Sequence, residues 1–448
     1  MTGRLRRGLR SSPRFVALYR GIRGFVRGGA PASGRTPPPT PRVEERVGQL
    51  RRVSPIPSAR SEFRLNLVVP TLDAARTFGG IRTALDVFEA TGADVGQRRI
   101  VSVGRTGSGA GDAVAGYQRV EGSEDPVAPL QYVALERPWA PLAVRDGDVF
   151  VATFWTTAEL IGRIRGWQTA TYGWVPPHFA YVVQDYEPGF YPWSAQWLLA
   201  RATYARPDET IGIYNTSSLR DYFHESGVRF GQEYAFEPRM LPELRAALTS
   251  PAVQRSRTIV VYGRPGTPRN AFPAIVDGLR AWRADDPNAA RWTVLSVGQA
   301  HPEIDLGGGL MLRSIGKLDL AAYATLLRES AIGISLMVSP HPSYPPLEMA
   351  HLGMLVLTNR FGAKDLSTWH SNIRTMDDLS AEGIAARLTE SCRQFEADPD
   401  IGDAGRSGRP EFTSDAPQFP FAAQLAAELR AGVERDRPAR APESASSP

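Results

Sequence analysis

Short apolar strands alternate with helical segments along most of this chain, and this alternation constrains the fold more than any other feature. The first strand, residues 64–69, is followed by a helical segment at 81–90 and by strands at 99–103, 149–153 and 180–183. Buried strands that alternate with helices are typical of a parallel, doubly wound sheet. The sequence therefore predicts an α/β fold.

A second cycle of the same pattern begins near residue 257. It has strands at 258–262, 292–297, 332–336 and 355–358, and helices at 271–284, 320–329 and 346–352. The length of 448 residues fits two such domains plus tails. The predicted divisions are a basic tail and linker at 1–60, an N-terminal Rossmann-like domain at 61–245, a C-terminal Rossmann-like domain at 246–410, a helix at 411–434 and a disordered tail at 435–448.

The positive charge of the chain is concentrated at its N-terminus. The net charge is +5, but residues 1–60 carry 14 arginines and two glutamates, which is +12, so the other 388 residues sum to −7. Nucleic-acid grooves need clustered positive charge on the folded domain, so no nucleic-acid partner is expected.

The first 28 residues combine arginines with an apolar helical face that runs from Phe15 to Val26. Such a helix suits an anionic membrane surface, and a disordered basic arm is the alternative. The sequence contains no stretch of 18 apolar residues, so no membrane-spanning helix is predicted. We expect a cytoplasmic protein that can lie on the inner face of the plasma membrane.

Several residue patterns that resemble metal or redox sites are set aside. The single cysteine, Cys392, excludes a disulfide framework, and the six histidines have no paired metal spacing. The pair Asp146 and Asp148 precedes the strand at 149–153, at the wrong end of a sheet for a ligand, and predicts a turn. We therefore expect no metal and no other cofactor.

Ligands of open α/β sheets bind beyond the carboxyl ends of the strands, so the residues that follow each strand are the candidate site. Arg264 and Arg269 lie in a compact loop after the strand at 258–262 and before a helix. Two guanidinium groups at a helix start suit a diphosphate. A solvated surface turn is the alternative.

A proline-rich loop follows the strand at 332–336 and contains His341. Glu348 lies in the first turn of the next helix, where its carboxylate can accept two ribose hydroxyl protons or simply complement the helix dipole. Lys364, one of only two lysines, follows the strand at 355–358.

Asp185 and Glu187 follow the strand at 180–183, and aromatic residues continue to Trp193. Carboxylates that orient hydroxyls, beside rings that stack on C–H faces, suit a sugar; packing of the rings into the core is the alternative. Gly79 and Gly80, after the first strand, permit close backbone approach at a helix start.

Five segments in this order resemble WsaF-type rhamnosyltransferases, bacterial enzymes that build surface rhamnan chains from dTDP-rhamnose. These segments read FGGIRTAL, VQDYEPGFYPW, YGRPGTPRNAF, LMVSPHPSYPPLEMA and TNRFGAKDLS. The spacing of Arg264 and Arg269, and the run from Glu348 to Gly353, also resemble the broad family-4 group of GT-B glycosyltransferases. The resemblance covers residues 63–375.

The resemblance implies the GT-B form of the α/β class, in which two Rossmann-like, doubly wound domains face a cleft. It also implies metal-independent transfer of L-rhamnose from a nucleotide-sugar donor to a growing glycan that can be lipid-linked. The implied roles are as follows: catalytic, Asp185 and Glu187; donor-binding, Arg264, Arg269, Gly298, Lys317, His341, Ser343, Tyr344, Glu348 and Lys364; acceptor-binding, Gly79, Gly80 and Tyr186.

The chain departs from the broad group at one position. Eight residues before Glu348, where that group has a further glutamate, stands Pro340. Backbone groups around residues 341–344 are therefore expected to hold the sugar. Two alternatives stay open, a degenerate GT-B protein that binds glycan or serves as a scaffold, and a nucleotide-sugar epimerase.

Overall fold

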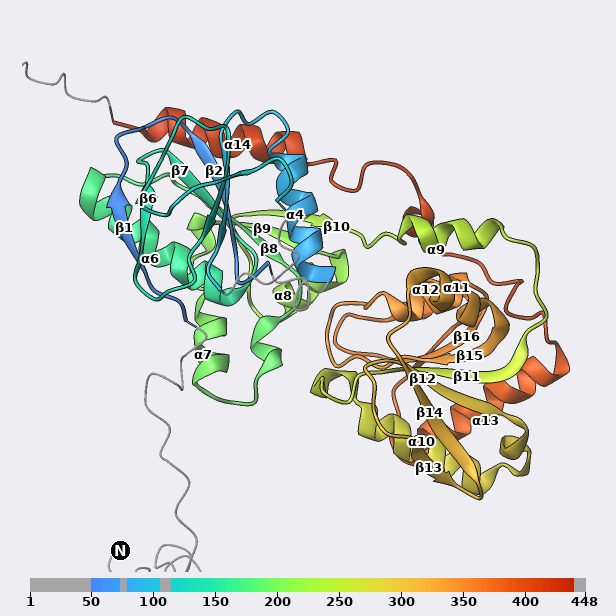
Figure 1. The fold of residues 1–448 in the computed structure, drawn as a ribbon. Helices are drawn as coiled ribbons and strands as arrows, with labels where there is room; N and C mark the ends of the chain where they lie inside the picture. The colour runs from blue at the N-terminus through green and yellow to red at the C-terminus, as the bar shows by residue number, and fades with distance from the viewer. Residues whose placement is uncertain (1–49, 73–78, 105–113, 439–448) are drawn as a thin grey trace, which may run out of the picture. The chain divides into compact units, whose positions relative to one another are not determined.

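The computed structural model describes residues 50–72, 79–104 and 114–438. The amphipathic segment near residues 15–26 lies outside this part of the chain. The described residues form two large sheets covered by helices (Figure 1). None of the helices in those residues is long and apolar enough to cross a membrane.

The N-terminal sheet is fully parallel and has the strand order β10-β9-β8-β7-β2-β3-β5-β4. Its strands are β2 (Arg64–Val69), β3 (Arg98–Ser102), β4 (Gln118–Arg119), β5 (Leu130–Ala134), β7 (Asp148–Ala152), β8 (Phe179–Val183), β9 (Thr210–Asn215) and β10 (Gln232–Phe236). The chain adds β3 on one side of β2 and β7 on the other, so the strand order reverses beside β2. Such a reversal is where open α/β sheets bind ligands.

Helices cover both faces of this sheet. On one face, α4 (Gly79–Thr91) and α14 (Ala422–Asp436) share a core with the strands; on the other lie α6 (Trp155–Tyr172) and α8 (Ser217–Glu225). After β8 the chain forms the short helix η1 (Glu187–Phe190) and then α7 (Ala195–Ala202). Local sequence sets these boundaries: α6 ends at Gly173 with φ 74°, and the Ser194 hydroxyl caps α7 by accepting the Trp197 N–H at 3.3 Å.

The last helix of the chain, α14, packs against the N-terminal sheet. Leu425, Leu429 and Val433 lie in the same core as β2 and α4, and the ring of Phe421 stacks on Tyr234 of β10 at 4.9 Å. In Figure 1, α14 lies beside α4. The chain thus returns to its first sheet after it has formed the second.

The C-terminal sheet has the order β13-β14-β12-β11-β15-β16-β17 and is parallel except for β13. Its strands are β11 (Ser256–Gly263), β12 (Thr293–Gly298), β13 (Ile304–Gly307), β14 (Leu310–Gly316), β15 (Ser330–Ile334), β16 (Leu355–Asn359) and β17 (Ile373–Met376). Its helices are α9 (Pro242–Ala246), α10 (Phe272–Asp285), α11 (Leu320–Glu329), α12 (Pro345–His351) and α13 (Ala381–Ala397). Here the order reverses between β11 and β15. The α/β prediction with two doubly wound sheets is confirmed.

Part of the predicted linker is a strand. β1 (Val53–Pro57) pairs in parallel with β6 (Ala140–Val144) in a separate two-stranded sheet. The linker prediction is therefore wrong for residues 53–57. Pro55 and Pro57 cannot donate to a ladder, but β1 has a partner on one side only within the described sheets, which tolerates prolines.

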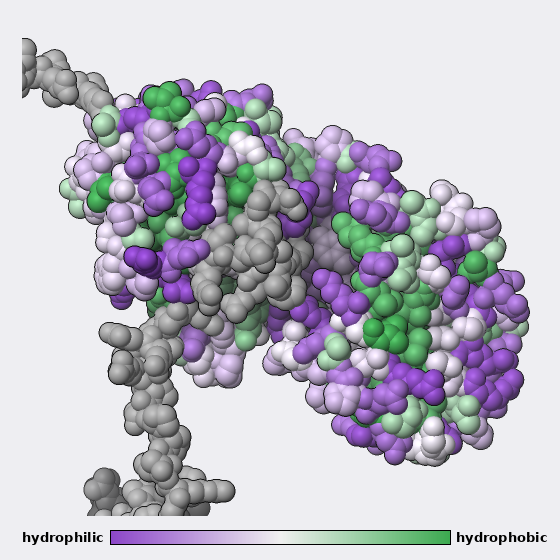
Figure 2. Space-filling model, viewed as in Figure 1, coloured by the Kyte–Doolittle hydropathy of each residue, from purple (hydrophilic) through white to green (hydrophobic). Residues whose placement is uncertain are grey.

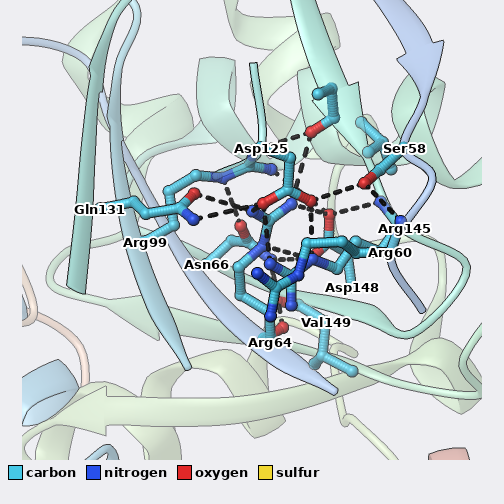
Figure 3. Close-up of polar contacts among 12 residues, drawn as sticks. Ser58, Arg60, Arg64, Asn66, Arg99, Asp125, Gln131, Arg145, Asp148 and Val149 are labelled. Carbon is cyan, nitrogen blue, oxygen red and sulfur yellow. Dashed lines mark hydrogen bonds and ion pairs between the residues drawn. The ribbon is translucent and has the colours of Figure 1, made fainter. Parts of the chain in front are cut away.

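A buried ion network lies at the amino ends of the central N-terminal strands (Figure 3). Asp148 accepts from Arg64 Nε at 2.7 Å and from Arg99 at 3.3 Å, and Asp125 joins Arg64 and Arg145 at 2.8 and 2.7 Å. All three arginines are fully buried. Burial alone would raise the pKa of Asp148, but the charges of Arg64 and Arg99 outweigh it and hold that pKa below its usual value.

The simple turn predicted at Asp146 and Asp148 is therefore incomplete, because Asp148 begins β7 and is 1% exposed. Its bonds join β7 to β2 and β3, and thus fix three central strands at one end.

The surface seen in Figure 2 mixes hydrophilic and hydrophobic residues.

Candidate functional site

The loop that follows β11 is held rigidly in front of α10. Arg264 N donates to Asn270 Oδ1 at 2.7 Å, and Gly266 N donates to Gln299 Oε1 at 2.8 Å. Asn270 is fully buried and donates through Nδ2 to Leu336 O at 3.1 Å, which ties the loop to the segment that follows β15. The two arginines predicted to hold a diphosphate therefore project from a fixed loop at the reversal point of this sheet.

Arg269 meets a carboxylate from the other large sheet. Its guanidinium forms an ion pair with Asp185 Oδ2 and lies 4.0 Å from the ring centroid of Phe190. Ser339 Oγ donates to the second oxygen of Asp185 at 2.6 Å. Asp185 is 9% exposed. The loops that follow β8, β11 and β15 thus meet at one carboxylate.

His341 lies beside this carboxylate with a defined protonation state. Burial lowers its pKa to about 4, and the Asp185 charge only partly opposes this, so the ring is neutral near pH 7. The Ser343 N–H donates to His341 Nδ1 at 3.0 Å, which leaves the proton on Nε2. That buried Nε2 has no hydrogen-bond partner among the described residues. It is a donor available to a ligand.

Lys364 is a fully buried amine that interacts electrostatically with the same carboxylate. Its Nζ donates to Met337 O at 2.6 Å. Burial lowers its pKa to about 7, against the opposing influence of the Asp185 charge. Arg269, His341 and Lys364 therefore all interact with the charge of Asp185, and two of these three groups can carry positive charge.

Glu348 belongs to a second group of polar residues in the C-terminal domain. It is 7% exposed, and burial raises its pKa to about 7, with the Tyr323 hydroxyl partly opposing this. Arg264 lies beside the hydroxyl of Tyr262, whose pKa burial raises and Arg264 lowers. A carboxyl poised near neutrality can ionise when a ligand donates hydrogen bonds to it.

Tyr344 connects the proline-rich loop to the N-terminal domain, and Ser343 precedes it in the chain. Ser343 has φ 68°, a left-handed backbone that is uncommon for serine and occurs often at functional sites. The Tyr344 hydroxyl lies beside Asn215 at the end of β9 and beside Thr83 of α4. The proline-rich loop therefore contacts both sheets.

Glu187, the second predicted catalytic carboxyl, points into the core. It is 1% exposed and accepts hydrogen bonds from Trp155 N at 2.5 Å and from the Tyr181 hydroxyl at 2.8 Å. Burial raises its pKa to about 8. Because Trp155 is the first residue of α6, this carboxyl satisfies a free N–H at a helix start. The buried position argues against the catalytic role predicted for Glu187.

The predicted acceptor residues lie at the carboxyl edge of the N-terminal sheet. Gly79 and Gly80 begin α4, and a β-carbon at Gly80 would come within 2.5 Å of Gln184 Oε1. A side chain at Gly80 would therefore displace the side chain of Gln184, the residue before Asp185. The ring of Tyr186 packs edge-on against Tyr222 at 5.2 Å, so much of it serves the core.

The remaining predicted donor residues lie along neighbouring strands. Gly298 ends β12 with φ 124°, and a β-carbon there would come within 2.7 Å of Gly263 O at the end of β11. Lys317 is exposed and follows β14. Neither contributes to the groups around Asp185 or Glu348 in the described contacts.

Sequence reasoning missed two residues that shape the site. Ser339 hydrogen-bonds Asp185, and Asn270 fixes the loop between the arginines and α10. Their positions after strand ends were a usable signal. Their partners were not visible, because Ser339 and Asp185 lie 154 positions apart.

Comparison with known proteins agrees with this architecture. Models of the N-terminal and C-terminal domains of WsaF match residues 64–217 and 257–389. The O-antigen biosynthesis protein RfbC of Myxococcus xanthus is 29% identical over 262 residues, which are 57% of this chain and 19% of that protein. The chain thus spans about a fifth of this relative's length.

Solved structures resemble the fold. WaaG, described as a glycosyltransferase involved in lipopolysaccharide biosynthesis, matches with TM-score 0.53 and 11% identity over 82% of this chain and 99% of its own. HepE of Anabaena, solved in complex with UDP, matches with TM-score 0.53 and 12% identity over 83% of this chain and all of its own. The fold is the GT-B fold of glycosyltransferases.

Proposed function

Because the chain belongs to the WsaF family and has the GT-B fold, we propose that it is a glycosyltransferase that moves L-rhamnose from dTDP-L-rhamnose to a growing bacterial surface glycan. The observation that carries this proposal is the contact of Asp185 with Arg269. This contact joins a carboxylate that follows a strand of one large sheet to an arginine that follows a strand of the other. That arginine is predicted to bind the diphosphate. The relative RfbC, named for O-antigen biosynthesis, supports the glycan product.

The donor binds the C-terminal domain in this proposal. Arg264 and Arg269 hold the diphosphate through charge-assisted hydrogen bonds, and Glu348 accepts the ribose hydroxyls. The base lies against Gly298 and Lys317. The HepE complex with UDP supports a nucleoside diphosphate as a ligand of this fold. The free Nε2–H of His341 donates to the sugar or the phosphate, which gives that buried group its missing partner.

Asp185 and the diphosphate compete for Arg269. When the diphosphate takes the guanidinium, Asp185 is released to accept the proton of an acceptor hydroxyl. That oxygen bonds to the sugar C1 while the bond from C1 to the phosphate oxygen breaks, and the electron pair leaves with the diphosphate. The charge that grows on the diphosphate is stabilised by the arginines, so they act on rate as well as on binding.

Glu187 acts as a positioning residue rather than a proton acceptor. Its bonds to Trp155 and Tyr181 fix the segment that carries Asp185 against α6. A conservative replacement by glutamine keeps hydrogen-bonding capacity and should preserve most activity.

Transfer to a defined acceptor tests the proposal. The full chain is incubated with dTDP-L-rhamnose and a soluble rhamnose oligosaccharide, with and without EDTA. We expect release of dTDP that requires the oligosaccharide and continues in EDTA, since the arginines supply the positive charge. A changed donor sugar without acceptor would indicate an epimerase. Binding of oligosaccharide without turnover of any nucleotide sugar would indicate a glycan-binding or scaffold protein.

A further inference from the structure

The segment that follows the candidate catalytic carboxylate carries an exposed aromatic surface. Trp193 is 85% exposed and Leu198 63% exposed, although large apolar side chains are usually covered. The rings of Trp193 and Trp197 lie 4.5 Å apart with an interplanar angle of 36°. We name this surface, formed by Trp193 and Trp197 at the start of α7, the tryptophan platform.

Two aromatic side chains that lie in the sequence between Asp185 and the tryptophan platform are fixed by the N-terminal domain. Phe190 stacks on Phe154 at 6.0 Å, and Tyr191 accepts the Trp155 Nε1–H at 2.9 Å. Phe190 also covers the guanidinium of Arg269. The rings of Phe190 and Tyr191 are therefore fixed at the start of α6, and Trp193 follows them closely in the chain.

We propose that the tryptophan platform binds sugar rings of the acceptor glycan other than the terminal sugar, which receives the new residue. This inference rests on the proposed function. Exposed indole rings stack on the C–H faces of sugars, while hydroxyls remain in water. The chemistry of the segment favours a neutral, hydroxyl-rich occupant, because residues 188–200 contain no charged side chain and Arg201, the next charged residue, is bound to the hydroxyl of Tyr186. An anionic membrane surface would instead favour arginine or lysine beside the tryptophans.

Glycan binding by the full chain tests the platform. Rhamnose oligosaccharides of one and four residues are titrated into wild type, Trp193→Ala and Trp197→Ala by calorimetry. Loss of one stacking ring should weaken the tetrasaccharide about tenfold and the monosaccharide less than twofold. Because Trp193 is so exposed, its replacement leaves the core intact, and dTDP binding should be unchanged.

Two control variants separate stacking from general apolar contact. Leu198→Ala removes an exposed aliphatic group from the same helix, and Trp139→Ala removes a tryptophan that is 60% exposed elsewhere in the N-terminal domain. Both should bind the tetrasaccharide as wild type does. If Leu198→Ala and Trp193→Ala instead release the protein from phosphatidylglycerol vesicles while glycan binding persists, the surface contacts membrane and the proposal fails.

Failure of the platform and failure of the proposed function give different results. Trp-dependent glycan binding without transfer from any nucleotide sugar keeps the platform and removes the transferase. Transfer whose dependence on acceptor length is unchanged by Trp193→Ala keeps the transferase and overturns the platform. Absence of oligosaccharide binding by the wild type also overturns it.

Discussion

Arg264 and Arg269 follow the same strand, but their surroundings differ. Arg264 lies beside Tyr262, whereas Arg269 is engaged by Asp185 and Phe190. We expect Arg264→Ala and Arg269→Ala each to lower donor turnover more than tenfold, because a charge-assisted contact contributes about 1.5–3 kcal/mol. Calorimetry with dTDP should show parallel losses. Arg257→Ala, on the same strand and paired with Glu396 at the surface, is the matched control.

A third variant, Asp185→Asn, tests the competition between Asp185 and the diphosphate for Arg269. In Asp185→Asn the ion pair with Arg269 is weakened, so dTDP should bind at least as tightly as in wild type while transfer is lost. Unchanged dTDP affinity in both arginine variants would mean that this loop does not bind the diphosphate.

His341 gives a pH prediction at the residue scale. Its pKa is about 4 in the folded chain, against an ordinary value near 6.5, so the unfolded chain binds more protons between these values. Stability should therefore fall as the pH drops from about 6.5 towards 4. Thermal unfolding at several pH values should show a smaller fall for His341→Gln. If the melting temperature changes equally with pH in the two proteins, His341 is exposed to solvent.

At this scale the sequence indicated residue types better than partnerships. Arg264, Arg269, Glu348 and Lys364 follow strand ends, and strand ends could be predicted from apolar runs. The contact of Asp185 with Arg269 could not, because the two residues lie 84 positions apart and meet only through the packing of two domains.

At the scale of elements, the buried ion network binds β2, β3 and β7 together. Asp148→Asn should lower the free energy of unfolding by about 3–5 kcal/mol, because it leaves buried guanidinium groups without their carboxylate. Urea denaturation measures this loss. Asp86→Asn is the control: it breaks an exposed pair with Arg82 that contributes about 0–1 kcal/mol.

The network should also make the fold sensitive to strong acid. The pKa values of Asp125 and Asp148 are lowered, so their contribution to the free energy of unfolding is present above the unfolded value near 3.9 and is lost as the pH falls further.

This cluster could not be predicted from the sequence, because charged residues at strand starts resemble turns. Nor could β1, because Pro55 and Pro57 make a strand look like a linker.

At the scale of the whole molecule, α14 supplies part of the N-terminal core. A chain that ends at Pro417 should lose solubility, because Leu425, Leu429 and Val433 cover apolar side chains of α4 and the sheet. A chain that ends at Pro438 keeps α14 and is the matched control. Soluble yield and melting temperature after expression compare the two. A stable, active protein ending at Pro417 would contradict the role of α14 in the core.

The basic N-terminal segment gives a second prediction at this scale. Residues 1–28 carry eight arginines and no acidic residue, and each such charge contributes about 1 kcal/mol near an anionic leaflet. A chain that begins at Gln49 retains β1 and should no longer sediment with anionic vesicles, while dTDP binding persists. Sedimentation at physiological salt measures this. Continued sedimentation of the shortened chain would place the anchor elsewhere.

The return of α14 to the first sheet also orders the events of synthesis. β10 ends at Phe236 and α14 ends at Asp436, so 200 residues are translated between the last strand of the N-terminal sheet and the end of the helix that covers it. At about 5–20 residues per second, this interval is about 10–40 s. The C-terminal sheet is contiguous in the chain and leaves the ribosome complete within that time. The domain translated first is therefore the last to close its core, and during that interval its apolar face is available to a chaperone.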